Sequence, residues 1–141
     1  MNYRTGDYAK YARFISETET QHNIPAGLLA LTLWQASAYD PDKIACKGQH
    51  PTIGVRGIAS LTPEDCKTLW NGDDRRDDPQ ACIVGAARLL KMQRDRFTTW
   101  KLALLAYHSS ADTVRKAMHG EAHIPIDADK YAAQARECCG V

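Results

Sequence analysis

The chain lacks a long run of apolar residues, an excess of charge of either sign, internal repeats and low-complexity tracts. Of its 141 residues 44% are hydrophobic and 25% are charged, and 18 Lys and Arg against 17 Asp and Glu give a net charge of +1. This balance argues against binding nucleic acid or anionic lipid through a basic surface. No apolar stretch approaches the roughly 20 residues of a membrane-spanning helix, so we expect no membrane insertion. The length fits a single domain over residues 1–141.

The cysteines do not form an obvious disulfide framework. There are five, which is an odd number, and two of them are adjacent near the C-terminus: Cys46, Cys66, Cys82, Cys138 and Cys139. Free thiols in a reducing compartment are the simplest interpretation. Cys46 and His50, with Cys66, have part of the spacing of a zinc site, but no second close pair completes it. We therefore predict neither a metal nor another cofactor.

Helical patterns dominate the sequence. Apolar spacing and capping residues predict helices over about 7–21, 25–37, 62–71, from 78 onward, 100–108, 111–119 and 127–137. The segment 25–37 is apolar nearly all round, so it is predicted to be a central buried helix. Between residues 40 and 61, three glycines and two prolines predict a long loop or small hairpin. The run Asp73–Asp78 is interpreted as a solvated charged turn. These patterns predict a mostly α fold.

Several short motifs occur in a particular order. They are Ile24–Ala30, Gln35–Pro41, Gly54–Pro63, Asp78–Pro79 with Gly85–Leu90, Ala106–Ser110 and Pro125–Tyr131. In this order and spacing they resemble the lysozyme-like lytic transglycosylases of the soluble-lytic-transglycosylase type, which cleave peptidoglycan. The resemblance spans about residues 8–135 and implies a goose-type lysozyme-like fold.

The resemblance also implies a mechanism with one carboxyl group. In the family, a Glu at the end of the buried helix protonates the leaving glycosidic oxygen and then acts as base, so that the 6-hydroxyl of the sugar closes a 1,6-anhydro ring. A carboxylic acid kept neutral by a poorly solvated site suits this role. This sequence has Ala36 at the corresponding position. Because a methyl group transfers no proton, we expect the chain to bind glycan strands and to cleave them poorly or not at all.

Nearby carboxylates do not obviously replace the missing acid. Asp40 and Asp42 follow the helix end, where a solvated turn is expected. Glu17 and Glu19 belong to a polar helical segment and are expected to be solvated. Glu64 suits the first turn of a helix. A relocated acid remains an alternative.

The resemblance also suggests residues that line the cleft. The predicted binding residues are Ser37, Tyr39, Ile58, Ser60, Tyr107, His108 and Tyr131. Tyr39 is predicted to stack on a sugar ring. For His108, a capping or core role is the alternative interpretation. If these side chains filled the groove around Ala36, glycan binding would be contradicted.

Two explanations account for alanine at position 36. One is natural loss of activity, which is favoured because Ala59-Ser60, His108 and Ser110 also depart from the family pattern. The other is an engineered Glu-to-Ala knock-out of an active enzyme. A different class of function is a structural or interaction protein that reuses the fold, such as a virion component, an injected protein or an inhibitor. The expected partner is accordingly a peptidoglycan glycan strand or a protein.

The start of the chain, Met1–Asp7, has no apolar stretch of the kind found in secretory leaders. We therefore expect synthesis in a cytoplasm without a signal peptide. Action at the cell wall or in the periplasm would then require delivery by a phage or a secretion system.

Overall fold

A computed structural model describes residues 2–43 and 54–141. The described residues form seven α-helices and no β-strand, which confirms the mostly helical fold. The helices are α1 (Tyr8–Gln21), α2 (Leu28–Ser37), α3 (Pro63–Trp70), α4 (Pro79–Phe97), α5 (Trp100–His108), α6 (Ala111–Met118) and α7 (Ile126–Cys139). None of these helices is long and apolar enough to cross a lipid bilayer.

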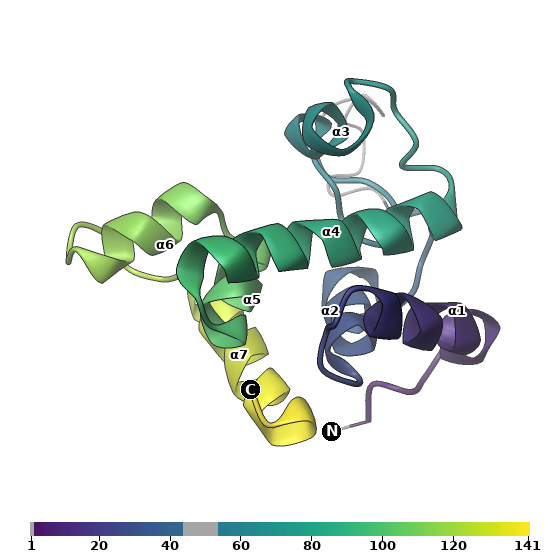
Figure 1. The fold of residues 1–141 in the computed structure, drawn as a ribbon, viewed down its shortest axis with the longest axis horizontal. Coiled ribbons are helices and arrows are strands. Elements are labelled where there is room, and N and C mark those ends of the chain that lie inside the picture. Colours follow the sequence, from purple (N-terminus) through teal and green to yellow (C-terminus); the bar gives the residue numbers. More distant parts are fainter. Residues whose placement is uncertain (1, 44–53) are drawn as a thin grey trace.

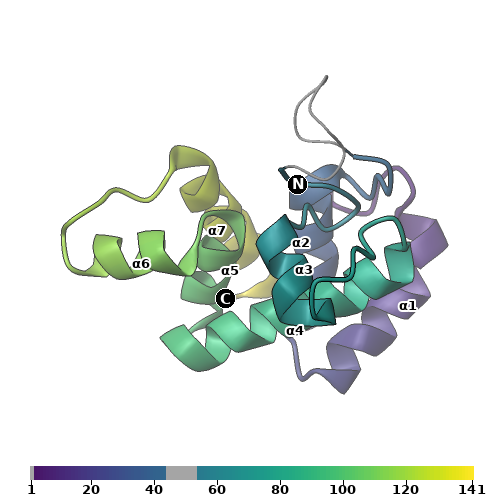
Figure 2. The same cartoon turned by 90° about the horizontal axis from the view of Figure 1, so that it is seen from above.

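Helix α4 runs through the middle of the molecule (Figure 1). Its N-terminal half lies beside α1 and α2, and its C-terminal end leads into α5, which in turn contacts α6 and α7. Seen from above, α6 lies at the far end from α1 (Figure 2). Helix α2 contacts α1, α4 and α7, so it is held by the preceding helix and by two helices that are distant in the sequence.

The predicted central helix is confirmed. Leu28, Leu29, Leu31 and Leu33 of α2 have no solvent-exposed surface. Each such side chain contributes roughly 1.5–3 kcal/mol relative to an exposed one. Because α2 is buried on nearly every side, its position and the direction of its C-terminal turn are firmly set.

The N-terminus of α2 is capped by Glu19 from α1. The Glu19 carboxylate accepts hydrogen bonds from the backbone N–H groups of Gly27, Leu29 and Ala30, at 3.1, 2.9 and 3.3 Å. These are among the donors that a helix leaves unpaired in its first turn. Burial raises the pKa of Glu19, and the three N–H groups oppose that rise. The prediction that Glu19 is solvated is wrong, since the residue is only 6% exposed.

The start of α3 is defined by a reciprocal cap. Thr62 Oγ1 accepts from the Asp65 N–H at 3.1 Å, and Asp65 Oδ2 accepts from the Thr62 N–H at 2.8 Å. Farther along the chain, Gly85 allows α3 to lie close to α4, because a Cβ there would lie 2.9 Å from Leu69 Cδ1 and 3.3 Å from Trp70 Cζ2. This close packing places the first turn of α3 at the edge of the site described below.

Candidate functional site

A cavity of about 560 Å³ opens at the C-terminal end of α2, between the loop before α3 and helices α5, α6 and α7. Hydroxyl, amide and imidazole groups make up much of its lining. Five of the predicted site residues line it: Ala36, Ser60, Tyr107, His108 and Tyr131. The side chains around Ala36 therefore leave the groove open, and the volume suits a small ligand or part of a longer one.

Ala36 lies in the last turn of α2 and is 6% exposed. Its carbonyl oxygen accepts a hydrogen bond from Ser60 Oγ at 2.7 Å and is also contacted by Lys43 Nζ. Lys43 Nζ donates to Ser60 Oγ as well, at 2.8 Å. An ammonium group thus contacts the backbone and a neighbouring hydroxyl at the C-terminal end of α2.

A network centred on Gln35 joins three helices at the cavity wall. Gln35 Nε2 donates to the Tyr131 carbonyl at 3.0 Å and to Gln134 Oε1 at 3.1 Å. Its Oε1 lies 3.0 Å from His108 Nε2. The rings of His108 and Tyr131 are 4.5 Å apart, centroid to centroid. These contacts fix α2, α5 and α7 relative to one another and orient both rings.

His108 is neutral at physiological pH. Burial, assisted by the positive charge of Lys43, lowers the pKa of His108 to about 3. The neutral ring then donates its Nε2–H to Gln35 Oε1, because the Gln35 amide nitrogen is already committed to two acceptors. Neutral His108 is therefore a polar wall of the cavity and carries no charge toward a ligand.

Residues 54–61 form a tight turn that builds another wall. Arg56 and Leu61 exchange backbone hydrogen bonds of 2.9 and 3.1 Å, and Ser60 has φ of 52°. Tyr107 Oη donates to the Ala59 carbonyl at 2.7 Å, so this hydrogen bond connects the turn to α5. Burial raises the pKa of Tyr107 well above its usual value. The prediction of a long loop or small hairpin in place of a helix is thus confirmed for residues 40–43 and 54–61, where Arg56 and Leu61 form an isolated antiparallel bridge.

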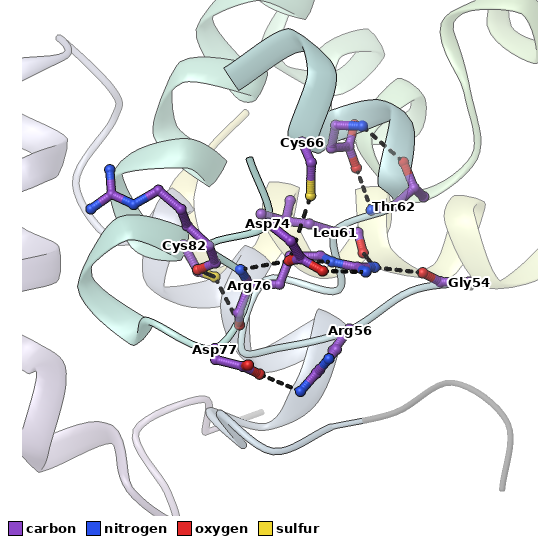
Figure 3. Close-up of polar contacts among 11 residues, drawn as sticks. Gly54, Arg56, Leu61, Thr62, Cys66, Asp74, Arg76, Asp77 and Cys82 are labelled. Atoms are coloured by element: carbon purple, nitrogen blue, oxygen red, sulfur yellow. Dashed lines mark hydrogen bonds and ion pairs between the residues drawn. The ribbon is translucent and has the colours of Figure 1, made fainter. Parts of the chain in front are cut away.

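A buried arginine connects this turn to the loop before α4 (Figure 3). Arg76 has a side chain that is 1% exposed, and it forms an ion pair with Asp74 at 2.9 Å. Its guanidinium also donates to the carbonyl oxygens of Gly54 and Leu61, at 2.8 and 3.2 Å. Gly57 approaches so closely that a Cβ there would lie 2.4 Å from the Arg76 carbonyl.

The interpretation of Asp73–Asp78 as a solvated charged turn is confirmed for every residue of the run except Arg76, which is buried. Hydrogen bonding to Arg76 lowers the pKa of Asp74 to about 2 against the opposing effect of burial. Arg56 extends the connection through an ion pair with Asp77 at 2.5 Å (Figure 3). Asp74 thus anchors an arginine that holds the cavity wall, although all four acids of the run remain exposed.

Three predicted binding residues do not line the cavity. Tyr39 has no exposed surface, and its Oη lies 2.7 Å from the Tyr3 carbonyl and 3.0 Å from the Ala30 carbonyl. Such a buried ring cannot stack on a sugar, so this assignment is corrected. Ile58 is likewise fully buried, and its carbonyl accepts from Ser37 Oγ at 2.5 Å. The hydrogen bond between Ser37 and Ile58 connects the end of α2 to the turn over residues 54–61, outside the cavity lining.

Three carboxylates are among the lining residues, and each has a different role. Glu64 has an 80% exposed side chain paired with Lys67 at 3.1 Å. Asp65 accepts the capping hydrogen bond from Thr62 described above. Asp127 is exposed in the first turn of α7. None of the three lies on α2 beside Ala36, where the family resemblance places the acid.

Lys43 and Gln35 were not predicted as site residues. Lys43 follows Pro41 in a loop without periodicity, so no local pattern indicates that its ammonium contacts the end of α2. Gln35 was part of a motif, but only the fold shows that its amide joins α5 and α7.

For a metal, residues 2–43 and 54–141 hold no group of three or more His, Cys, Asp and Glu side chains arranged as ligands. Cys66, Cys82, Cys138 and Cys139 are free thiols. Cys46 and His50, considered above as part of a zinc site, lie outside the described residues.

Residues 13–129 match the transglycosylase SLT domain family. The chain belongs to this family. Membrane-bound lytic murein transglycosylase F 2 from Alkalilimnicola ehrlichii is 36% identical over 87 residues, which cover 62% of this chain and 18% of that protein. Membrane-bound lytic murein transglycosylase F 1 from the same organism is 33% identical over 87 residues, covering 62% and 16%. The chain thus spans less than a fifth of the length of either relative.

Solved structures of SLT proteins share the fold. The 70 kDa soluble lytic transglycosylase from Escherichia coli superposes with a TM-score of 0.66 over 90% of this chain and 24% of that one, at 18% identity. The lytic transglycosylase Slt from Pseudomonas aeruginosa, solved as an inactive mutant with glutamine in place of a glutamate, also superposes on this chain. The TM-score is 0.62 over 86% of this chain and 20% of that one, at 18% identity. The predicted lysozyme-like lytic transglycosylase fold is confirmed.

Proposed function

We propose that this SLT domain binds peptidoglycan glycan strands in the cavity beside Ala36 and cleaves them at a negligible rate. The observation that carries the proposal is an open cavity at the end of the buried helix, lined there by an alanine whose carbonyl oxygen is contacted by an ammonium group. Family membership supports the ligand, since the relatives are named murein transglycosylases.

The physical reason for low activity is the lack of a proton donor in the right place. Losing a positioned general acid costs about 10²- to 10⁴-fold in rate, and more when one group serves as both acid and base. His108 is neutral, and with a pKa of about 3 it does not hold a proton to transfer near neutral pH. Glu64 and Asp127 line the cavity from α3 and α7, and neither lies on α2 beside Ala36.

The experiment compares four forms of the protein on purified murein sacculi. Sedimentation with sacculi measures binding, and chromatography of released anhydro-muropeptides measures cleavage. The wild type is expected to bind and to release almost nothing. Ala36→Glu is expected to release product, whereas Ala36→Gln, which matches the size of glutamate without its acidity, is not.

The fourth form addresses the ammonium next to position 36. A cation within about 4–6 Å lowers the pKa of a carboxyl group by 1–3 units, so Lys43 would keep the carboxyl introduced by Ala36→Glu ionised. The double variant Ala36→Glu/Lys43→Met is therefore expected to be more active than Ala36→Glu alone. Rapid product release by the wild type would contradict the proposal, and absence of binding to sacculi would favour a protein-interaction role instead.

A relocated acid is the second candidate, and one observation favours it. Asp65 lines the cavity and is only partly exposed. If the wild type releases anhydro-muropeptides and Asp65→Asn abolishes that release while Asp127→Asn does not, Asp65 supplies the proton. Equal release by all three proteins would reject this candidate.

A further inference from the structure

The cavity contains one amino group whose charge the described part of the chain does not neutralise. Lys43 is partly buried, and its Nζ contacts two uncharged oxygens, the Ala36 carbonyl and Ser60 Oγ. No ion pair among the described residues includes Lys43. Because an ammonium group has three N–H donors, these two contacts leave one donor for another acceptor.

The surroundings of Lys43 make this charge costly. Burial lowers the pKa of Lys43, and the charge of Asp40 opposes the change only in part. Asp40 is itself exposed and accepts from the Asp42 N–H at 2.9 Å. Across the cavity, the charge of Lys43 reaches His108 and helps to keep that ring neutral. A partly desolvated cation without a counter-ion interacts more strongly with an incoming anion than a surface lysine does.

The carboxylates that line the cavity have other partners or positions. Glu64 pairs with Lys67, Asp65 caps α3, and Asp127 is exposed at the start of α7. The other lining residues include hydroxyl, amide and aromatic groups, which suit a polyhydroxylated ring, beside apolar ones such as Val55 and Leu89. The cavity therefore combines polar and aromatic groups that suit a saccharide with one cation at the end of α2.

We propose that Lys43 binds a carboxylate carried by the saccharide ligand, so that this SLT domain prefers glycan strands whose muramic acid carboxyl is free of peptide. The inference rests on the glycan-binding function proposed above. N-acetylmuramic acid carries a lactyl carboxyl group, which is an anion when unsubstituted and an uncharged amide when a peptide is attached. Lys43 thus distinguishes two forms of the same glycan by charge.

Four defined ligands test the proposal by calorimetry: a peptide-free GlcNAc–MurNAc tetrasaccharide, its methylamide, the same tetrasaccharide carrying peptide stems, and neutral chitotetraose. We expect the free acid to bind about tenfold more tightly than the methylamide, as a charged hydrogen bond of moderate strength would give. Raising the salt concentration from 0.02 to 0.3 M should reduce this ratio, while the affinity for the methylamide changes little.

Variants assign the preference to Lys43. Lys43→Met should bind the acid and the methylamide equally, and Lys43→Arg should keep the preference because it keeps the charge. Lys101→Met, which removes an exposed lysine of α5 outside the cavity lining, is the matched control and should behave as the wild type does. A melting temperature is measured for each variant, and the salt dependence of the wild type provides a test that needs no variant.

The outcomes separate the two proposals. Equal affinity of the wild type for the acid and the methylamide overturns the role of Lys43 and leaves glycan binding intact. Tight binding of the peptide-bearing tetrasaccharide also overturns it, because the carboxylate recognised would then belong to the peptide. If none of the four ligands binds, the glycan-binding function itself fails.

Discussion

Acidification should destabilise this domain through His108, whose ring packs in the cavity wall against Tyr131 and donates to Gln35. The pKa of His108 is about 3 in the folded chain, against about 6.5 for an unperturbed histidine. Between pH 6.5 and pH 3, His108 therefore binds a proton in the unfolded chain and does not bind one in the folded chain. In that interval, stability falls as the pH falls, and above pH 7 the contribution of His108 is constant.

The magnitude follows from the width of the interval. Each pH unit below 6.5 removes up to about 1.4 kcal/mol from the free energy of unfolding. At pH 5 the loss is up to about 2 kcal/mol, reduced to the extent that water in the cavity solvates the charged ring. With a urea m-value of about 2 kcal/mol/M for a chain of this size, the unfolding midpoint should fall by up to about 1 M between pH 7.5 and pH 5.

The assay is urea unfolding followed by helical circular dichroism at pH 7.5, 6.5, 5.5 and 5.0, on the wild type and on His108→Asn. Asparagine retains an amide near Gln35 but does not titrate. The variant is less stable at pH 7.5 because it loses the ring packing, yet its midpoint should change less between pH 7.5 and 5. The other histidines and carboxyl groups titrate in both proteins, so the difference between the two pH profiles isolates His108. Parallel profiles would refute the reasoning.

Two further predictions concern the supports of the site, each with a neighbouring control. Arg76→Met should lower the free energy of unfolding by about 2–4 kcal/mol in urea titration, because the loop carbonyls lose a buried donor. The control is Arg75→Met, which removes a side chain that is 51% exposed and should change the free energy of unfolding by less than about 0.5 kcal/mol. Similar losses for both would contradict the structural role of Arg76. Glu19→Ala should lower the free energy of unfolding by about 2 kcal/mol, measured by thermal or urea unfolding, because three N–H groups at the start of α2 lose their acceptor. Its control, Glu17→Ala, removes an exposed i,i+4 pair with Arg13 and should lower the free energy of unfolding by less than about 0.5 kcal/mol. A neutral Glu19→Ala would show that the cap contributes little.

The helices were predictable because their signals are local. Apolar spacing, Thr62-Pro63 and Asp78-Pro79 act within a few residues of where they occur, and the observed helices begin and end within about three residues of the predicted bounds. The motif order indicated the SLT family for the same reason, since each motif is a short stretch with a fixed place along the chain.

Burial of polar residues was not predictable. Glu19 and Glu17 are two residues apart in one polar segment, yet only Glu19 faces the first turn of α2. Arg76 has charged neighbours on both sides, yet only its guanidinium is enclosed by carbonyl oxygens from another loop. Tyr39 was misassigned because the left-handed turn that follows α2 directs its ring into the core.

By itself, the sequence determined that α2 is buried and that an alanine stands at its C-terminal end, because both follow from residue identity and helical periodicity. Only the tertiary structure decided what surrounds that alanine. Lys43, Ser60, His108 and Tyr131 come from a loop, a turn and two later helices, and their distances depend on how those elements pack. Through-space charge and desolvation depend on that packing, and sequence order contains neither.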